Sequence, residues 1–207
     1  KLGDYYTNFV MNFERAMTYY QRAVALAHEV GNSGREAVFL SLIGLLKSKQ
    51  GFDEADIYLE NAYQLAKSGT DDLCLCTVLE QRGYAEGIRG NYQKAREALE
   101  EALEVITRLS TLNVLSHTEI ERRRFYSMLN LGEAEYELGS FEKAIETRQR
   151  ALLIAEQQGN QVWIGYAHYE LGDTYHRTDN RNLAREHMNL ALQLFEQNNA
   201  TRDVEAV

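Results

Sequence analysis

The sequence lacks proline altogether and contains only two cysteines, Cys74 and Cys76, among its 207 residues. Because proline interrupts helices and marks turns, its absence favours a chain of helices joined by Gly and Asn. Two cysteines are too few for a disulfide framework, so we expect free thiols and a reducing, cytoplasmic location. No strand-like alternation of polar and apolar residues is sustained, and no β-sheet is predicted.

Long hydrophobic runs and an excess of positive charge are also missing. The longest apolar runs are far shorter than the roughly 20 residues that span a bilayer, so no membrane association is expected. The formal net charge is −9. Nucleic-acid binding depends largely on neutralising phosphates with Lys and Arg, so no nucleic-acid partner is expected either.

What the sequence does contain is a repeated pair of alanines seven residues apart. The five pairs are Ala16/Ala23, Ala55/Ala62, Ala95/Ala102, Ala144/Ala151 and Ala184/Ala191. Seven residues make two helical turns, so the alanines of a pair lie on one stripe of a helix. A neighbouring helix is expected to approach closely there, and a larger side chain would cost about 1–3 kcal/mol. Glycines precede the pairs at similar offsets, at Gly3, Gly44, Gly83, Gly132 and Gly172, and close helix crossing would explain them.

These patterns predict five helical hairpins. The expected helices span residues 1–10, 12–30, 33–50, 52–68, 71–89, 91–110, 117–138, 140–158, 161–178 and 181–198. The second helices are expected to begin at N-caps, namely Asp53, Asn91, Ser140 and Asn180. The alanine anchors are 39 or 40 residues apart except for the 49 residues from Ala95 to Ala144. This longer spacing predicts an insertion near residues 110–117 that lengthens the flanking helices or adds a loop.

This pattern resembles the tetratricopeptide repeat. The resemblance is carried by Leu131-Gly132, by Leu171-Gly172 with Tyr175, by Leu138-Gly139 and by the alanine pairs. It implies an all-α, right-handed solenoid of about five helical-hairpin repeats, in one domain over residues 1–207. The units would cover about 1–31, 32–70, 71–116, 117–159 and 160–199.

The period of about 40 residues differs from the usual form of roughly 34. It is more similar to the repeats of kinesin light chains, cell-polarity adaptors and bacterial nucleotide-switch (STAND/NB-ARC-type) signalling proteins. The stretch "YELGDTYHRTDNRNLAREHMNLALQLFEQNN" resembles most the C-terminal sensor repeats of this bacterial group.

No motif for catalysis, metal binding or nucleotide binding occurs, so we expect neither an enzyme nor a cofactor. Cys74 and Cys76 would point about 200° apart on a helix and could not chelate one ion together. His168 is expected in the core, whereas His176 and His187 could face each other across the last hairpin. The basic run at residues 122–124 is interpreted either as a solvated helix start, compensated by neighbouring glutamates, or as a patch that binds an acidic tail or phosphate.

In the family, the first helix of each repeat faces the concave, ligand-binding side. Transferred to this sequence, that rule gives candidate partner-binding residues Tyr84, Tyr126, Asn130, Glu133, Tyr166, Tyr169, Asp173 and Arg177. Tyrosines supply rigid contact area and are enriched in binding hot spots, although tyrosines on these helices can also simply fill space. Glu133 and Asp173 occupy equivalent positions, and their repulsion requires a cation from Arg177, from His176 or from a basic or amine-bearing partner. Neutralising both carboxylates is therefore expected to spare stability or to raise it.

Three functions remain open from the sequence. The chain is interpreted as a protein- or ligand-binding module and as a fragment of a larger signalling or regulatory protein, in which it is the sensor or interaction region. It could instead be a stand-alone interaction adaptor or scaffold, or the non-catalytic part of a truncated enzyme. The oligomeric state is not predicted.

Overall fold

The computed structural model describes the backbone of residues 2–198 and the side chains of residues 13–198. Within that range the chain forms nine α-helices and no strand. The all-α class agrees with the sequence prediction, although the sequence predicts ten helices. The helices within that range are α1 (Leu2–Glu29), α2 (Ser33–Ser48), α3 (Ala55–Ser68), α4 (Asp72–Ile88), α5 (Tyr92–Leu112), α6 (His117–Glu137), α7 (Phe141–Gln157), α8 (Gln161–Arg177) and α9 (Arg181–Gln197).

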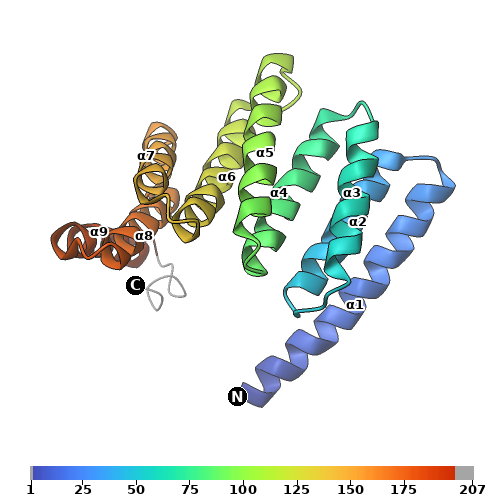
Figure 1. Ribbon diagram of the computed structural model, residues 1–207, viewed down its shortest axis with the longest axis horizontal. Coiled ribbons are helices and arrows are strands. Elements are labelled where there is room, and N and C mark those ends of the chain that lie inside the picture. The colour runs from blue at the N-terminus through green and yellow to red at the C-terminus, as the bar shows by residue number, and fades with distance from the viewer. Residues whose placement is uncertain (1, 199–207) are drawn as a thin grey trace. The chain divides into compact units, whose positions relative to one another are not determined.

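The helices after α1 pair in sequence order as the hairpins α2/α3, α4/α5, α6/α7 and α8/α9 (Figure 1). The chain divides into two compact units, residues 1–105 and 106–207, and the boundary falls within α5. The first unit contains α1 to α4 with the first part of α5. The second contains the end of α5 and α6 to α9, so each unit is a short run of helices packed on their neighbours.

The turn within each hairpin is built around one residue with positive φ. These residues are Gly51, Gly90, Gly139 and Asp179, with φ of 74°, 76°, 76° and 60°. In the α6/α7 turn the Ser140 N–H donates to the Glu135 carbonyl at 2.9 Å, and the Gly139 N–H donates to the Tyr136 carbonyl at 2.8 Å. This pair of bonds is the Schellman motif, which ends a helix through a left-handed residue.

The first predicted hairpin is wrong, because α1 runs without a break from Leu2 to Glu29. The sequence predicted separate helices at residues 1–10 and 12–30, joined by Met11-Asn12-Phe13. That tripeptide contains no glycine, and none of its residues adopts a positive φ. Without a left-handed residue to end the helix, the backbone hydrogen bonding continues. The described residues therefore contain one long helix followed by four hairpins rather than five hairpins.

The alanine pairs of the hairpins confirm the predicted close contacts. The eight alanines of α3, α5, α7 and α9 in these pairs are at most 5% exposed, whereas Ala16 and Ala23 of α1 are only partly buried. The glycines explain how the hairpin helices approach so closely. A Cβ added to Gly44, Gly83, Gly132 or Gly172 would lie 2.5–2.9 Å from a side-chain atom of the second helix, belonging respectively to Leu59, Leu99, Arg148 and Met188.

The predicted insertion lengthens the helices on both sides of it. Helices α5 and α6 have 21 residues each, against 14 to 17 in the other hairpin helices. Only residues 113–116 lie between them, with Asn113 at a φ of 52°.

The predicted N-cap positions of the second helices are confirmed at Ser140 and Asn180 and wrong at Asp53. Ser140 and Asn180 occupy the cap positions of α7 and α9 but make no capping hydrogen bond with their side chains. Helix α3 begins after Glu54 instead of Asp53, and Asn91 donates its side-chain amide to Glu86 at 2.7 Å. Side-chain caps occur on the first helices instead, from Asn32, Asp71, Ser116 and Asn160. Asn32 and Asn160 also follow a left-handed glycine, Gly31 and Gly159, so these two caps differ from Ser140 and Asn180 in side-chain orientation and not in the turn that precedes them.

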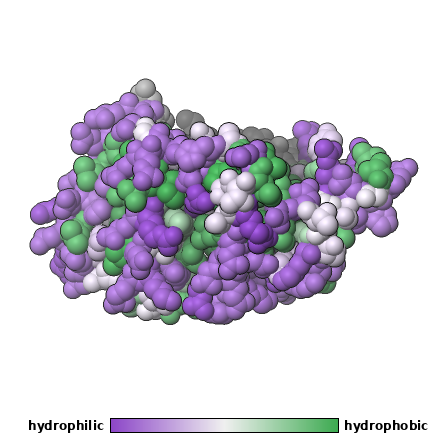
Figure 2. All heavy atoms as spheres, turned by 90° about the horizontal axis from the view of Figure 1, so that it is seen from above, coloured by the Kyte–Doolittle hydropathy of each residue, from purple (hydrophilic) through white to green (hydrophobic). Residues whose placement is uncertain are grey.

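None of the helices in the described part of the chain is long and apolar enough to cross a membrane. The face of the molecule in Figure 2 is mostly hydrophilic, with hydrophobic residues in separate patches.

Candidate partner-binding site

A buried arginine is the most unusual residue of the second unit. Arg148 is 0% exposed and lies on α7, four residues after the anchor Ala144. The equivalent residues of the other hairpins are apolar: Leu59, Leu99 and Met188. Its Cγ would be 2.7 Å from a Cβ on Gly132, so the glycine makes room for the arginine stem. Arg148 is not among the residues predicted from the sequence, although the repeat register places it at a core position.

The Arg148 guanidinium joins two first helices through their carboxylates. Its Nη2 lies 2.6 Å from Glu133 Oε2 on α6 and 2.8 Å from Glu170 Oε2 on α8. Its Nη1 donates to the Glu170 carbonyl at 3.1 Å and to the Thr174 hydroxyl. A charge withdrawn from water needs such partners, because an unpaired buried charge costs several kcal/mol. The arginine thereby fixes the positions of two carboxylates at the surface.

A second arginine, Arg177, forms ion pairs with the neighbouring carboxylates. Its Nη1 lies 3.3 Å from Glu133 Oε1 and 3.5 Å from Asp173 Oδ2, and its Nη2 pairs with Glu137. The guanidinium carbon is 3.9 Å from the centre of the Tyr136 ring, within the range of a cation–π contact. These contacts again connect the last turns of α6 and α8.

Between α6 and α8 lies an open cavity of about 340 Å³. It is lined by Tyr126, Leu129, Asn130, Glu133, Tyr169, Glu170 and Asp173, which we call the α6/α8 patch. Five of the eight candidate residues predicted from the sequence are among them, and Arg177 is paired with two of their carboxylates. The equivalence of positions on successive first helices thus brings these side chains together, as the repeat register implies.

The other two candidate residues lie elsewhere. The Tyr166 ring packs edge-on against Phe195 of α9, with ring centres 5.2 Å apart, and does not line the cavity. Tyr84 belongs to the first unit, is 41% exposed, and has the Lys49 amine 5.4 Å from its ring centre.

The electrostatics of the patch are set by burial and by its own arginines. Burial raises the pKa of Glu170, while Arg148 opposes that effect. Burial also raises the pKa of the Tyr169 hydroxyl, with Glu170 and Asp173 contributing. Tyr169 therefore remains a neutral hydrogen-bonding group at neutral pH.

The repulsion expected between Glu133 and Asp173 is relieved within the chain. Arg177 pairs with both carboxylates, which is one of the two internal solutions that the sequence left open; His176 is not involved. The expectation that neutralising both acids spares or raises stability is corrected accordingly. Glu133 is a partner of the fully buried Arg148, so its loss would leave that cation with one carboxylate fewer.

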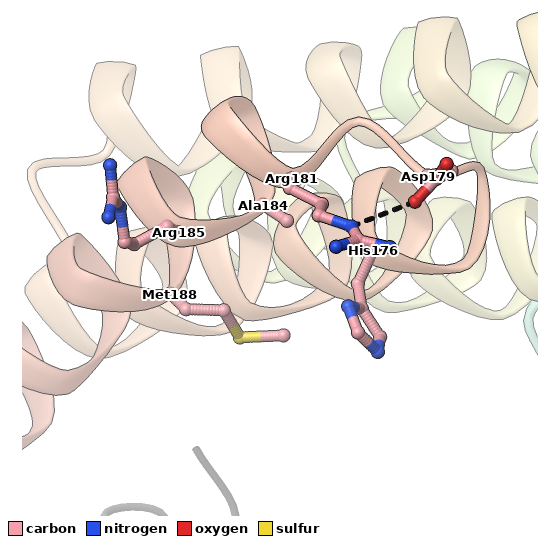
Figure 3. A pocket seen from close by; sticks show the side chains of 6 residues that line it. All are labelled: His176, Asp179, Arg181, Ala184, Arg185 and Met188. Carbon is pink, nitrogen blue, oxygen red and sulfur yellow. Dashed lines mark hydrogen bonds and ion pairs between the residues drawn. The ribbon is translucent and has the colours of Figure 1, made fainter.

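A larger cavity of about 570 Å³ lies on the last hairpin (Figure 3). Its lining consists of His176, Asp179, Arg181, Ala184, Arg185 and Met188, and Arg181 pairs with Asp179 at 3.0 Å. Met188 is the equivalent of Arg148, which contacts α6 of its own hairpin and α8 of the following one. This cavity therefore has the character of a helix-packing face rather than of a small-molecule site.

The histidines of the last hairpin meet differently from the prediction. His187 contacts His168, with their Nδ1 atoms 2.9 Å apart, and not His176. His168 is half-buried between α8 and α9, which agrees with its expected packing role. Among the residues with described side chains, no group of three or more His, Cys, Asp or Glu could hold a metal ion.

Both cysteines are free thiols. Burial, and then the hydrogen bond from the Cys74 thiol to Asp71, raise the pKa of Cys74 to about 11. The thiol is thus protonated at neutral pH, whereas nucleophilic attack and metal binding require the thiolate.

Sequence comparison with family models gives a match over most of these hairpins. A tetratricopeptide repeat model matches residues 35–108 and 124–197. The chain belongs to the tetratricopeptide repeat family. Tetratricopeptide repeats are generally non-catalytic and generally bind proteins or peptides, so this chain is a repeat module of that general kind. Comparison with curated proteins finds no match.

Several solved structures share the fold. BtubC (BKLC) from P. vanneervenii is 21% identical, with a TM-score of 0.69 over 89% of this chain and 74% of the other. The repeats of a putative kinesin light chain from Podosopora anserina are 16% identical, with a TM-score of 0.70 over 91% and 89% of the two chains. MamA MSR-1 C2 is 18% identical, with a TM-score of 0.51 over 88% and 98%. At these identities the likeness concerns the fold alone.

Proposed function

We propose that this repeat module binds a protein or peptide partner at the α6/α8 patch, and that the partner presents a basic or amine-bearing segment. The observation that carries the proposal is the cavity between two successive first helices, in which the exposed Tyr126 and the half-buried Tyr169 adjoin carboxylates held in place by a buried arginine. Tyr126 is 40% exposed at this cavity and offers ring surface to a ligand.

The charge balance of the patch favours a cationic partner. The two arginines, Arg148 and Arg177, form ion pairs with four acids: Glu133, Glu137, Glu170 and Asp173. With all four acids ionised, four negative charges against two positive charges leave an excess of two negative charges. Such a surface steers positively charged partners and repels acidic ones.

The setting that we propose is the sensor or interaction region of a larger cytoplasmic signalling protein. The support is the repeat family together with the resemblance of the last hairpin to bacterial nucleotide-switch regulators, and the two free thiols fit a reducing compartment. A stand-alone adaptor or scaffold is the second candidate, and the non-catalytic part of an enzyme is the third. Sequencing the coding region on both sides of this segment distinguishes the three settings. A nucleotide-binding P-loop in the same chain would support the signalling protein, and a catalytic motif would support the enzyme.

The binding proposal is tested by selecting peptides from a displayed random library against the whole chain. Selected peptides should be enriched in Lys and Arg, and their binding should weaken with added salt, since the Debye length is only about 8 Å at physiological ionic strength. Tyr169→Ala should weaken binding of a selected peptide by roughly 30-fold if this tyrosine is a hot spot.

Matched variants locate the peptide. Leu153→Ala, at an exposed position of α7 outside the cavity, should leave the affinity unchanged. Tyr84→Ala reports whether the surface includes the first unit. Selected peptides without basic residues, or peptides indifferent to both Tyr169→Ala and Asp173→Asn, would contradict the proposed site.

A further inference from the structure

Three hydrogen-bond acceptors of the α6/α8 patch have no donor within the chain. Glu170 pairs with Arg148 through its Oε2 atom at 2.8 Å, and no residue with a described side chain donates to its Oε1 atom. Asp173 likewise meets Arg177 through Oδ2, which leaves Oδ1. The side-chain amide of Asn130 makes no hydrogen bond within the described part of the chain. Three residues around one cavity thus each offer an oxygen to a ligand.

None of the three carboxylates at this cavity has both of its oxygens free. Both oxygens of Glu133 are taken, Oε2 by Arg148 and Oε1 by Arg177. Glu170 and Asp173 each keep one. A guanidinium binds a carboxylate best through two parallel hydrogen bonds, which need both oxygens of one group. An ammonium donates three single hydrogen bonds in separate directions, so the free acceptors match an ammonium better than a guanidinium.

The remaining lining of the cavity suits a methylene chain. Tyr126, Leu129 and Tyr169 supply the apolar part of the wall. The Tyr126 ring is held in place, because it packs edge-on against Phe125 and Trp163 with ring centres 5.1 and 6.1 Å apart. The volume of about 340 Å³ is at the small end of ligand sites, which measure roughly 300–1,000 Å³. The cavity therefore has the size for one side chain whose stem contacts the tyrosines and whose charge meets the acids.

We propose that the α6/α8 patch recognises a lysine side chain of its partner and discriminates against arginine. This inference rests on the proposed function and narrows the basic or amine-bearing segment to one primary ammonium on a flexible stem. The ammonium donates to Glu170 Oε1, Asp173 Oδ1 and Asn130 Oδ1. The stem packs against Tyr126 and Tyr169. An N-terminal α-ammonium has the same three donors but stands on a branched carbon without such a stem, so it fits the cavity less well.

Arg177 maintains this preference for lysine. Its Nη1 atom lies 3.5 Å from Asp173 Oδ2, and so prevents that carboxylate from receiving an arginine through both oxygens. Its other contacts, with Glu137 and with the ring of Tyr136, hold the guanidinium at this position. Loss of Arg177 would leave both oxygens of Asp173 free and would open the site to a bidentate arginine.

The first experiment compares forms of one peptide by calorimetric titration into the whole chain. The probe is a basic peptide selected as described above and synthesised with an acetylated N-terminus. Its anchor is the basic residue whose replacement by alanine weakens binding to the wild type most and binding to Asp173→Asn least. The anchor should be a lysine. Replacing it with arginine or with trimethyllysine, which keeps the charge but has no N–H, should each weaken binding roughly 10-fold or more.

The outcomes of this comparison separate the lysine preference from the binding function. Equal affinity of the lysine and arginine forms, an arginine at the anchor, or tighter binding of trimethyllysine would overturn the preference and leave a patch that binds basic segments. Binding that disappears on acetylation of the N-terminus would assign the cavity to an α-ammonium and would also overturn it. If no basic peptide binds at the patch, the proposed function fails and the preference fails with it.

The second experiment measures the ratio of the affinities for the lysine and arginine forms in variants of the protein. In Arg177→Gln this ratio should fall several-fold, because Asp173 gains a free oxygen. Asn130→Ala should also lower it, since it removes an acceptor of the ammonium. Leu153→Ala is the control and should keep the wild-type ratio, because Leu153 is exposed on α7 outside the cavity. The ratio is taken within each variant, so a general loss of affinity cancels. A ratio unchanged in both Arg177→Gln and Asn130→Ala would overturn the proposed recognition.

Discussion

Arg148 shows how one residue can change a repeat without changing its fold. The position is filled by Leu59, Leu99 and Met188 in the other hairpins, and each lies against the glycine of its first helix. Arginine fits the same space because its methylene stem packs as those side chains do. Its guanidinium pairs with the carboxylates of Glu133 and Glu170. A position that only packs in the other hairpins therefore also determines where two acids of the α6/α8 patch lie.

Arg148→Met should destabilise the protein by about 3 kcal/mol, because Glu133 and Glu170 lose a buried cation. Methionine fits the site sterically, as Met188 shows. Burial raises the pKa of Glu170 even with Arg148 present, and without the arginine it should rise further. The native state then favours protonated Glu170 more than the unfolded state does, so the loss should shrink as the pH falls through the carboxyl range.

The check is urea denaturation of both proteins at neutral and acidic pH. Addition of Glu170→Gln to Arg148→Met is the control, since it removes the unpaired, partly buried carboxylate and should restore part of the stability. A variant whose deficit is the same at both pH values would show that packing, not charge, is the role of Arg148.

At the scale of the element, each hairpin depends on a close approach of its two helices. In α4, Gly83 lies against Leu99, and an added Cβ would be 2.5 Å from the buried Leu99 Cγ. Gly87, one turn further along the same helix, has no such neighbour within 4 Å. The two glycines therefore serve different purposes although they are four residues apart.

We expect Gly83→Ala to destabilise the protein by about 1–2 kcal/mol, because overpacking outweighs the gain in helix propensity. Gly87→Ala should stabilise it by about 0.5–1 kcal/mol, because alanine restricts the unfolded chain without a clash. Denaturant midpoints of the two variants give the comparison directly. Equal stability of the two would mean that α4 and α5 do not pack as the structure has them.

The α8/α9 hairpin should lose stability as the pH falls. Burial lowers the pKa of both His168 and His187, and Glu186 is the charged group that partly opposes this shift. Two Nδ1 atoms 2.9 Å apart share one proton well but cannot both carry one. The folded protein thus binds fewer protons than the unfolded chain once the pH falls below about 6.5, and stability declines at up to about 1.4 kcal/mol per pH unit for each proton.

Unfolding free energies between pH 7.5 and pH 5 test this. The double variant His168→Gln with His187→Gln should flatten the decline. His28→Gln is the control, because His28 is exposed and lies on α1, where it pairs with Glu36 of α2, far from the histidine pair in sequence. This variant should preserve most of the decline in stability. If the unfolding free energy of the double variant fell with pH as steeply as that of the wild type, the histidine pair would not be the cause of the decline.

At the scale of the whole molecule, a repeat chain is held together by contacts between neighbours. The described helices follow this rule, since most close contacts join helices adjacent in sequence or first helices of adjacent hairpins. Local changes should therefore have local effects, and the two compact units should respond separately.

Ala151→Leu tests that locality together with the repeat register. Ala151 is 0% exposed, so leucine should cost about 1–3 kcal/mol by overpacking. In hydrogen exchange, the loss of protection should concentrate in α6 to α9 and largely spare α2 to α4. Uniform loss over all helices would show that the chain unfolds as one cooperative body.

The sequence by itself determined the helical class, the four hairpins and the contents of most of the site. Ala pairs, glycines and a 40-residue period each reflect contacts that recur in every repeat, so they can be read without knowing the partner helix. The same register correctly placed Tyr126, Glu133, Tyr169 and Asp173 around one cavity, because equivalent positions on stacked helices face the same way.

Only the tertiary structure decided the features that depend on one particular neighbour. The continuity of α1 depends on the absence of a left-handed residue at 11–13, which the hairpin pattern concealed. The pairing of Arg177 with Glu133, the packing of Tyr166 on Phe195 and the contact between His168 and His187 join side chains on different helices. The burial of Arg148 likewise depends on the helices around it. Periodicity fixes which face of a helix a residue occupies, whereas the rotamer and the charge that it meets there are set by the helix opposite.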